Sequence, residues 1–346
     1  MERPRFIPSS CCLLAAVLLT GAASSGHERP RVRFVIQVSD KYGYIDHSGR
    51  VVIPPKYDFA WAFTEGLAAV YLSSRPGHID RTGFIDEAGR LVIPMRFQYA
   101  RAFEERRAEV ELNDKWGFID RKGRFAVKPR YDAVHAFSEG FAAVKRDDKW
   151  GYVNRQGREA IAPQYDLTWS FGEGLAGVSQ GAKCGFINRR NEVVIGFRFN
   201  ECSGFHGGPS PVRVGNKWGY INKRGEFVVQ PTFENAWPFF EGLAAVKLHG
   251  KWGYIDPSGK IVIAPRFEDS GPFVRPLGVF REGLAEVKIG SKWGFVNKEG
   301  KVVIPPRFTA ASGFSNGLAE VWDPHCAYID SSGSIIWTAN HAPGVN

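Results

Sequence analysis

Hydrophobic and polar positions along this chain repeat with a period of about 34 residues. The repeated segment reads Lys-Trp-Gly-aromatic-Ile/Val-Asp/Asn, and its best copies occupy residues 149–154 and 251–256. Steps of 34 residues separate its glycines from Gly83 to Gly253, and steps of 40 and 41 residues flank that run. A fixed period of this kind predicts a repeat architecture rather than two ordinary domains. The glycines are Gly43, Gly83, Gly117, Gly151, Gly185, Gly219, Gly253 and Gly294, and Ala327 takes the ninth place.

Each copy predicts three short antiparallel strands in a meander. A Gly-Leu-Ala-Ala-Val-Lys strand comes first, and a two-residue turn such as His249-Gly250 joins it to the Trp-Gly strand. Asp or Asn followed three residues later by Gly, as in Asp256 and Gly259, then closes a tight turn into a Val-Ile strand. Nine such meanders, about 34 residues each, fit residues 31–338.

The alternation of side chains predicts which surfaces are buried. In the Ala-Val strand one face stays small and apolar, whereas the opposite face varies between Ala69, Glu109, Glu286 and Glu320, so we expect that strand to be half exposed. The Trp-Gly strand is apolar on both faces, which predicts a central strand covered by neighbouring meanders.

A connector of about 14 residues separates the meanders. We expect proline to end the third strand, because it cannot donate to a ladder, and two recurring aromatics such as Tyr57 and Phe63 to anchor the connector. The fold class is therefore all-β, a tandem array of about nine three-stranded antiparallel meanders. The pattern fits a propeller-like ring or an open β-superhelix, and it does not decide between them.

The repeated signature resembles the WG-repeat (KWG-repeat) family of bacterial β-repeat proteins. It recurs over residues 31–338 as Lys-Trp-Gly-Tyr/Phe-Ile/Val-Asp/Asn, then Gly, Val-Ile-Pro and Glu-Gly-Leu-Ala-Ala-Val. The resemblance implies a repeat scaffold with an interaction role and no particular reaction. The copies depart from the pattern at the Trp position, where Tyr42, Thr82, Cys184 and Cys326 stand, and at residues 206–209.

The first 25 residues resemble a secretory signal peptide. Arg3 and Arg5 precede a short apolar run, and small residues at 22–25 offer a cleavage site. We expect no transmembrane span beyond this segment, although an uncleaved anchor is the alternative. Residues 26–30 are then a short linker and residues 339–346 a C-terminal tail. Export to the periplasm or the exterior follows from this interpretation.

Charge and cysteine content narrow the possible partners. The formal net charge of the chain is +9, yet its basic residues are interleaved with acidic ones, so nucleic acid is an unexpected partner. Beyond the signal segment only Cys184, Cys202 and Cys326 remain. Cys184 and Cys202 could form a disulfide in an exported protein, but plain packing is the favoured interpretation.

The sequence offers no convincing active site, cofactor motif or metal site. Residues 177–181 match Gly-x-Ser-x-Gly, but Ser179 lies where two strands are joined and not at a strand-to-helix elbow. Acidic residues precede the connector glycine in five copies, and this repetition favours a structural role; they are Glu65, Glu139, Glu173, Glu241 and Glu282. The recurring lysines before Trp-Gly suggest a basic ribbon or local ion pairs.

Candidate contact residues come from one connector position that differs between copies. It holds Trp61, Arg101, His135, Trp169 and Trp237, so we expect it near the surface. Tryptophans there could stack on sugars or contact proteins, or simply cap the connector.

The leading hypothesis is a non-catalytic binding or scaffold protein of the bacterial envelope or exterior that contacts protein partners. The alternative is lectin-like binding of cell-wall or extracellular glycans, and an enzyme with a central site is a third class.

Overall fold

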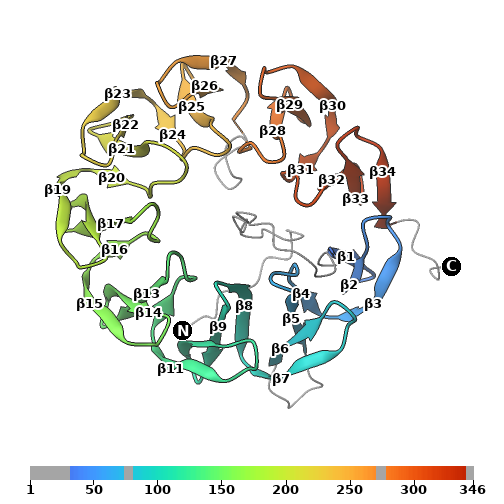
Figure 1. Ribbon diagram of the computed structural model, residues 1–346. Helices are drawn as coiled ribbons and strands as arrows, with labels where there is room; N and C mark the ends of the chain where they lie inside the picture. Colours follow the sequence, from blue (N-terminus) through green and yellow to red (C-terminus); the bar gives the residue numbers. More distant parts are fainter. Residues whose placement is uncertain (1–31, 74–80, 270–277, 340–346) are drawn as a thin grey trace, which may run out of the picture.

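The computed structural model describes residues 32–73, 81–269 and 278–339. These residues form nine antiparallel sheets that follow one another around a ring, so the fold is a nine-bladed β-propeller (Figure 1). The ring decides between the two predicted shapes. Within the described ranges no helix is long and apolar enough to cross a membrane. The predicted signal segment, the linker and all but the first residue of the predicted tail lie outside the described residues.

The blades are consecutive segments of the chain. Blades 1 to 3 are β1 (Phe34–Val38), β2 (Lys41–Ile45), β3 (Val51–Tyr57); β4 (Phe59–Ala60), β5 (Leu67–Leu72), β6 (Arg81–Asp86), β7 (Leu91–Phe97); and β8 (Tyr99–Glu104), β9 (Arg107–Leu112), β10 (Lys115–Ile119), β11 (Phe125–Tyr131). Blades 4 to 6 are β12 (Ala133–Val134), β13 (Phe141–Arg146), β14 (Lys149–Asn154), β15 (Glu159–Tyr165); β16 (Leu167–Thr168), β17 (Leu175–Gln180), β18 (Lys183–Asn188), β19 (Val193–Phe199); and β20 (Glu201–Cys202), β21 (Ser210–Val214), β22 (Lys217–Ile221), β23 (Phe227–Phe233). Blades 7 to 9 are β24 (Asn235–Ala236), β25 (Ala244–Leu248), β26 (Lys251–Ile255), β27 (Ile261–Phe267); β28 (Leu284–Ile289), β29 (Lys292–Asn297), β30 (Val302–Phe308); and β31 (Ala310–Ala311), β32 (Leu318–Trp322), β33 (Cys326–Asp330), β34 (Ile335–Thr338).

The predicted order of three strands is confirmed, and seven blades add a fourth strand inside the predicted connector. This strand, two residues long in six of them, lies on the inner side of the ring, whereas β7, β11, β19 and β27 lie on the outer side (Figure 1). Each of these seven blades therefore runs from an inner strand through the Ala-Val and Trp-Gly strands to an outer strand, and the described parts of blades 1 and 8 begin at the Ala-Val strand.

The glycine of the Trp-Gly strand is required because the outer strand folds over it. In eight blades the outer strand carries a bulge opposite this glycine. A Cβ at Gly219 would lie 2.5 Å from the carbonyl oxygen of Val229 and 2.8 Å from the nitrogen of Pro231. In blade 9 the outer strand ends at Thr338 and forms no such bulge, so Ala327 is tolerated there.

The expectation that proline ends the third strand is wrong. Strand β3 runs through Pro54 and Pro55 to Tyr57. Two physical features explain this: an outer strand has a free edge, and the prolines lie in the bulge, so their missing N–H groups interrupt no ladder bond. Proline at this edge also hinders unwanted pairing with other strands.

The expectation of a half-exposed Ala-Val strand is also wrong. Ala69 is fully buried, and Glu109 and Glu320 expose only 3% and 8% of their surface. The reason is that neighbouring blades cover both faces of this strand, as predicted only for the Trp-Gly strand. The blades are joined by ring contacts in which the aromatic after Gly meets the second connector aromatic of the next blade. Eight such pairs, from Tyr44–Phe63 to Phe295–Phe314, have centroids 4.8 to 5.2 Å apart.

The ring closes by packing and without a shared strand in the described ranges. Blade 1 and blade 9 are each built from their own chain segment. The Tyr328 hydroxyl donates to the carbonyl oxygen of Val35 over 2.7 Å, as the Tyr44 hydroxyl does to Trp61 over 2.8 Å. Phe34, Tyr328 and Trp337 belong to one buried cluster at this seam. The seam therefore uses the same aromatic position as the other junctions, but here its partners lie on β1, because blade 1 has no inner strand among the described residues.

Candidate functional site

The five candidate residues occupy equivalent places beside the inner strands. The backbone N–H groups of Trp61, His135, Trp169 and Trp237 donate to the Ala-Val strand of the same blade over 2.9 to 3.0 Å. Arg101 lies at the same place within β8. The residues belong to blades 2, 3, 4, 5 and 7, so the ring distributes them around its inner side and does not gather them into one pocket (Figure 1).

Trp61 is a packing residue and not a surface residue. It exposes 9% of its surface and contacts the rings of Phe59 and Tyr99 at 4.5 and 5.4 Å. In its blade the buried Thr82 stands where other copies have Trp. Blade 2 therefore has its tryptophan beside the inner strand and a short side chain at the usual Trp position.

Trp169 and Trp237 are half-buried and have fixed backbones. The hydroxyl groups of Tyr152 and Tyr220, from the preceding blades, donate to their carbonyl oxygens over 2.7 and 2.8 Å. Trp169 accompanies Cys184, a second small residue at the Trp position. Trp237 instead lies in the same blade as the buried Trp252, so blade 7 has tryptophan at both positions. These two indoles are the partly exposed aromatic surfaces among the candidates.

Arg101 and His135 form a polar sector in blades 3 and 4. The Arg101 guanidinium pairs with the Glu109 carboxylate at 2.8 Å and lies 4.7 Å from the Trp116 ring centroid. The His135 imidazole stacks on Trp150 at 4.7 Å and 23°. Burial lowers the pKa of His135, and the charge of Arg101 adds to that effect. Burial raises the pKa of Glu109, against the opposing influence of Arg101.

Glu104 is a further titratable group that sequence reasoning missed. It lies at the end of β8, the only six-residue inner strand among the described blades, which a tight turn joins to β9. Burial, together with the charges of Glu109, Glu105 and Glu65, raises the pKa of Glu104 to about 7. The inner strand is longer in this blade than in the others. No spacing in the sequence predicts a buried glutamate at its end.

Stability should therefore fall as pH rises through the interval from about 4.5 to about 7 because of Glu104. The folded state holds this proton more tightly than the unfolded chain, so the penalty is absent below the lower value and complete above the higher one. Glu104→Gln removes the ionised group and should gain about 2 kcal/mol at pH 8 and little at pH 5. Urea unfolding at the two pH values measures this difference. Glu299→Gln, at an exposed turn, serves as control, and an equal gain there would contradict the assignment to Glu104.

The periodic charged residues are structural, as their repetition predicts. The Glu105 carboxylate accepts the Gly140 N–H at 2.8 Å and pairs with Arg155 at 2.7 Å, and Glu139 contacts Gly174 and Arg189 in the same way. Each glutamate thus links its blade to the next one. The lysines before Trp-Gly form local pairs, including Lys41–Asp58, Lys115–Asp132, Lys149–Asp166 and Lys251–Glu268.

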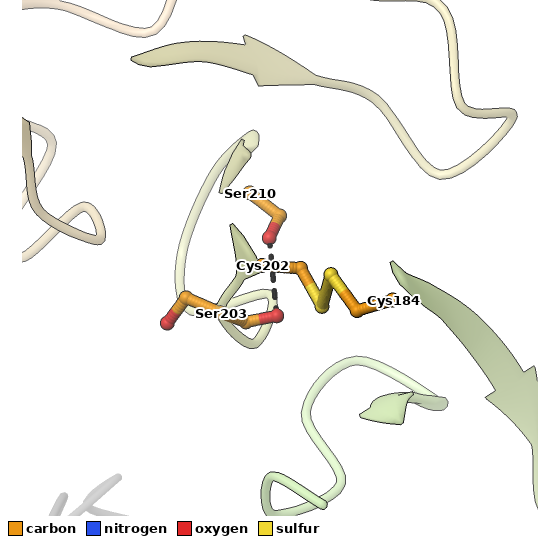
Figure 2. Close-up of a disulfide and its surroundings, with 4 residues drawn as sticks. All are labelled: Cys184, Cys202, Ser203 and Ser210. Carbon is orange, nitrogen blue, oxygen red and sulfur yellow. Dashed lines mark hydrogen bonds between the residues drawn. A yellow bond between two sulfur atoms is a disulfide. The ribbon is translucent and has the colours of Figure 1, made fainter. Parts of the chain in front are cut away.

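Cys184 and Cys202 form a disulfide, so the favoured interpretation of plain packing is wrong (Figure 2). Cys184 lies on β18 of blade 5 and Cys202 on the inner strand β20 of blade 6, with their Cα atoms 6.2 Å apart. The two residues meet because the Trp position of one blade faces the inner strand of the next. Ser179 lies beside this bond in β17, opposite Cys184, and it is buried.

Removing this cross-link should lower stability. The bond closes a loop with a sequence separation of 18 residues, and Cys184→Ala with Cys202→Ala should cost about 3 kcal/mol. Thermal unfolding with and without a reducing agent provides the measurement. The parent protein should lose stability on reduction and the double variant should not. Equal effects of reductant on both proteins would show that the bond does not contribute.

The described residues contain no group of three or more His, Cys, Asp or Glu side chains arranged to hold a metal ion. Most of the site could not be predicted from the sequence, because an alignment of the copies does not show which residues contact one another. The missing signal was paired variation: tryptophan on the inner strand accompanies a small residue at the Trp position in blades 2 and 5, and Arg101 accompanies Glu109 in blade 3.

Comparison with known proteins supports the propeller and identifies the repeat. A structure described as the eukaryotic initiation factor shares 13% identity with this chain at a TM-score of 0.61, over 89% of this chain and 96% of its own. A dihydro-heme d1 dehydrogenase, NirN, gives a TM-score of 0.49 at 15% identity, over 91% of this chain and 74% of its own. At such identities the first likeness shows the fold alone. No curated protein matches the sequence.

The family model described as WG containing repeat matches eight tandem segments between residues 42 and 321. The segments are 42–73, 83–116, 116–150, 150–184, 185–218, 218–252, 252–293 and 293–321. Each segment begins in the Trp-Gly strand of one blade and ends in or just after the second or third strand of the next, so the matched unit is offset by about half a blade. This chain therefore belongs to the family of proteins built from WG containing repeats.

Proposed function

We propose that this propeller is a non-catalytic scaffold of the bacterial envelope or exterior that binds protein partners on its inner side. The observation that carries the proposal is the variation at one inner position within an otherwise repeated frame. The ring aromatics and the inter-blade glutamates recur from blade to blade, whereas Arg101, His135, Trp169 and Trp237 differ in size and charge. Arginine and large aromatics are the residue types enriched in protein interfaces.

The disulfide supports the proposed location. Disulfides persist in oxidising compartments such as the periplasm and the exterior, and they are rare in the reducing cytosol. The Cys184–Cys202 bond joins two blades and lies in the buried core. A protein exported by an N-terminal signal would meet the conditions in which this bond forms.

Photo-crosslinking from a matched pair of leucines tests the binding side. Leu167 lies on the inner strand β16 and Leu91 on the outer strand β7, and they expose 56% and 52% of their surface. A photo-reactive amino acid at each position would be activated in envelope extract. We expect a discrete protein adduct from position 167 and not from position 91. Profiles that are identical with and without extract, or adducts from position 91 alone, would overturn the proposal.

Glycan binding is the second candidate, and the partly exposed indoles of Trp169 and Trp237 favour it. An indole face stacks well on the apolar face of a sugar ring. Trp61 is buried and cannot act in this way without a change in packing. A glycan array with the parent protein, Trp169→Ala and Trp237→Ala decides this candidate, with Trp61→Ala as the control for a stability effect. Absence of binding, or binding that both exposed-site variants retain, would remove it.

A further inference from the structure

One face of the ring carries the turns between the Trp-Gly strand and the outer strand, which we call the outer turns. They include residues 120–124, 154–158, 188–192 and 222–226 in blades 3 to 6. The turns at the inner strands share this face, as the contact between Glu105 of blade 3 and Arg155 of blade 4 shows. The turns that precede the Trp-Gly strands lie on the opposite face, because successive strands run in opposite directions.

The outer turns of blades 3 to 6 are all net basic, whereas among the other five blades only blade 8 is net basic. Together with the two outer-strand residues that follow each turn, these four blades contain nine basic and four acidic residues. The same positions in the other five blades contain five basic and six acidic residues. The four blades are neighbours along one side of the ring (Figure 1). These positions thus carry a net charge of +5 in blades 3 to 6 and −1 in the other five blades.

Several of these cations are free of internal ion pairs. Arg155, Arg189 and Lys223 pair with glutamates of the preceding blade at 2.7 to 2.9 Å. By contrast, Lys122, Arg158 and Arg224 are exposed and form no ion pair with the described residues. Their charge is available to an external partner, whereas the first three hold the blades together.

Exposed apolar side chains adjoin the basic turns. Val193 and Val194, the first residues of β19, expose 53% and 44% of their surface. Phe125 of β11 and Val228 of β23 expose 38% and 41%. We call the basic outer turns of blades 3 to 6 with these four apolar residues the basic rim. Exposed apolar residues arranged beside free cations mark an interaction surface.

We propose that the basic rim docks onto an anionic lipid bilayer. The charges complement acidic headgroups, and the flanking valines and phenylalanine fit the boundary between headgroups and acyl chains. A soluble polyanion would engage the cations but would gain nothing from the apolar residues. A single protein partner would be expected to use a localised pocket, whereas the basic rim extends over four blades. This surface is separate from the inner side and does not depend on the function proposed above.

Vesicle sedimentation tests the docking surface with matched variants of the whole chain. The vesicles contain phosphatidylcholine alone or phosphatidylcholine with phosphatidylglycerol. The charge variant is Lys122→Gln, Arg158→Gln and Arg224→Gln, and its control is Lys183→Gln, Lys217→Gln and Lys288→Gln toward the opposite face, with the same change in net charge. The apolar variant is Val193→Ser with Val194→Ser. Its control is Leu91→Ser with Val92→Ser in blade 2, which expose 52% and 45% and follow a net acidic turn.

We expect the parent protein to bind the anionic vesicles and not the neutral ones. The charge variant should lose roughly fivefold in partitioning for each residue, or roughly 100-fold in total, and its control should bind like the parent. The apolar variant should bind several-fold more weakly than Leu91→Ser/Val92→Ser. No preference for anionic vesicles, or equal losses in both charge variants, would overturn the proposal. Full competition by dextran sulfate, with the apolar variant unaffected, would also overturn it by showing a polyanion site.

Discussion

Gly219→Ala should destabilise the protein by about 3 kcal/mol or more, because the outer strand leaves no space for a side chain. The added Cβ would meet the Val229 carbonyl oxygen at 2.5 Å, and that oxygen belongs to the backbone and not to a flexible side chain. The bulge would have to shift, and the contacts of the outer strand with its neighbours would shift with it. Chemical denaturation of the variant and the parent protein measures the loss.

Blade 9 provides the control for this effect. Ala327 occupies the equivalent position, where the outer strand forms no bulge over it. Ala327→Gly should therefore cost only about 0.5 to 1 kcal/mol, through backbone entropy. If Gly219→Ala lowered stability as little as Ala327→Gly, the close approach of the outer strand would not explain the regular spacing of glycines along the chain.

Trp337→Ala should cost about 3 to 5 kcal/mol and should loosen the ring at one place. Trp337 is 6% exposed and packs against Tyr328, which contacts Phe34 across the seam. No peptide bond crosses this seam within the described ranges, so the packing and the Tyr328–Val35 hydrogen bond hold it. Hydrogen exchange should show the earliest loss of protection in β1–β3 and β31–β34.

Trp252→Ala tests whether the loss of a buried tryptophan loosens only its own blade or always loosens the seam. Trp252 is 1% exposed in blade 7, away from the seam, and its removal should cost a similar free energy. Protection should then fall around β24–β27, while blades 1 and 9 keep theirs. Loss at the seam in both variants would mean that the ring opens there whichever blade is damaged.

Much of the fold could be predicted from the sequence because several copies of one pattern show which positions recur. The Asx–Gly turns appear as predicted: Gly49 and its equivalents adopt positive φ, and Asn191 does so at +63° where Gly is absent. The sequence did not indicate the two-residue inner strands, since a segment such as Phe59–Ala60 is too short to show alternation. Nor did it indicate burial of Glu109, because a carboxylate at an alternating position usually faces water.

The candidate site was harder to predict because it depends on contacts between strands. The variation from Trp61 to Arg101 suggested exposure, which the structure shows for Arg101 and His135 and not for the buried Trp61. The charge of Arg101 is matched by Glu109 on the neighbouring strand. A single sequence shows each position alone, and the pairing becomes visible only when strands β8 and β9 are placed side by side.

The seam between blades 1 and 9 has a consequence for the order in which the blades are connected. Because every blade is one continuous segment and packing alone joins blade 9 to blade 1, the contacts of the ring do not require that the chain ends lie at this seam. A gene that begins at blade 6, with residues 32 and 339 joined by a short linker, would encode the same circle of contacts. The cyclic order of the blades, and not the position of the first residue, would then define the ring.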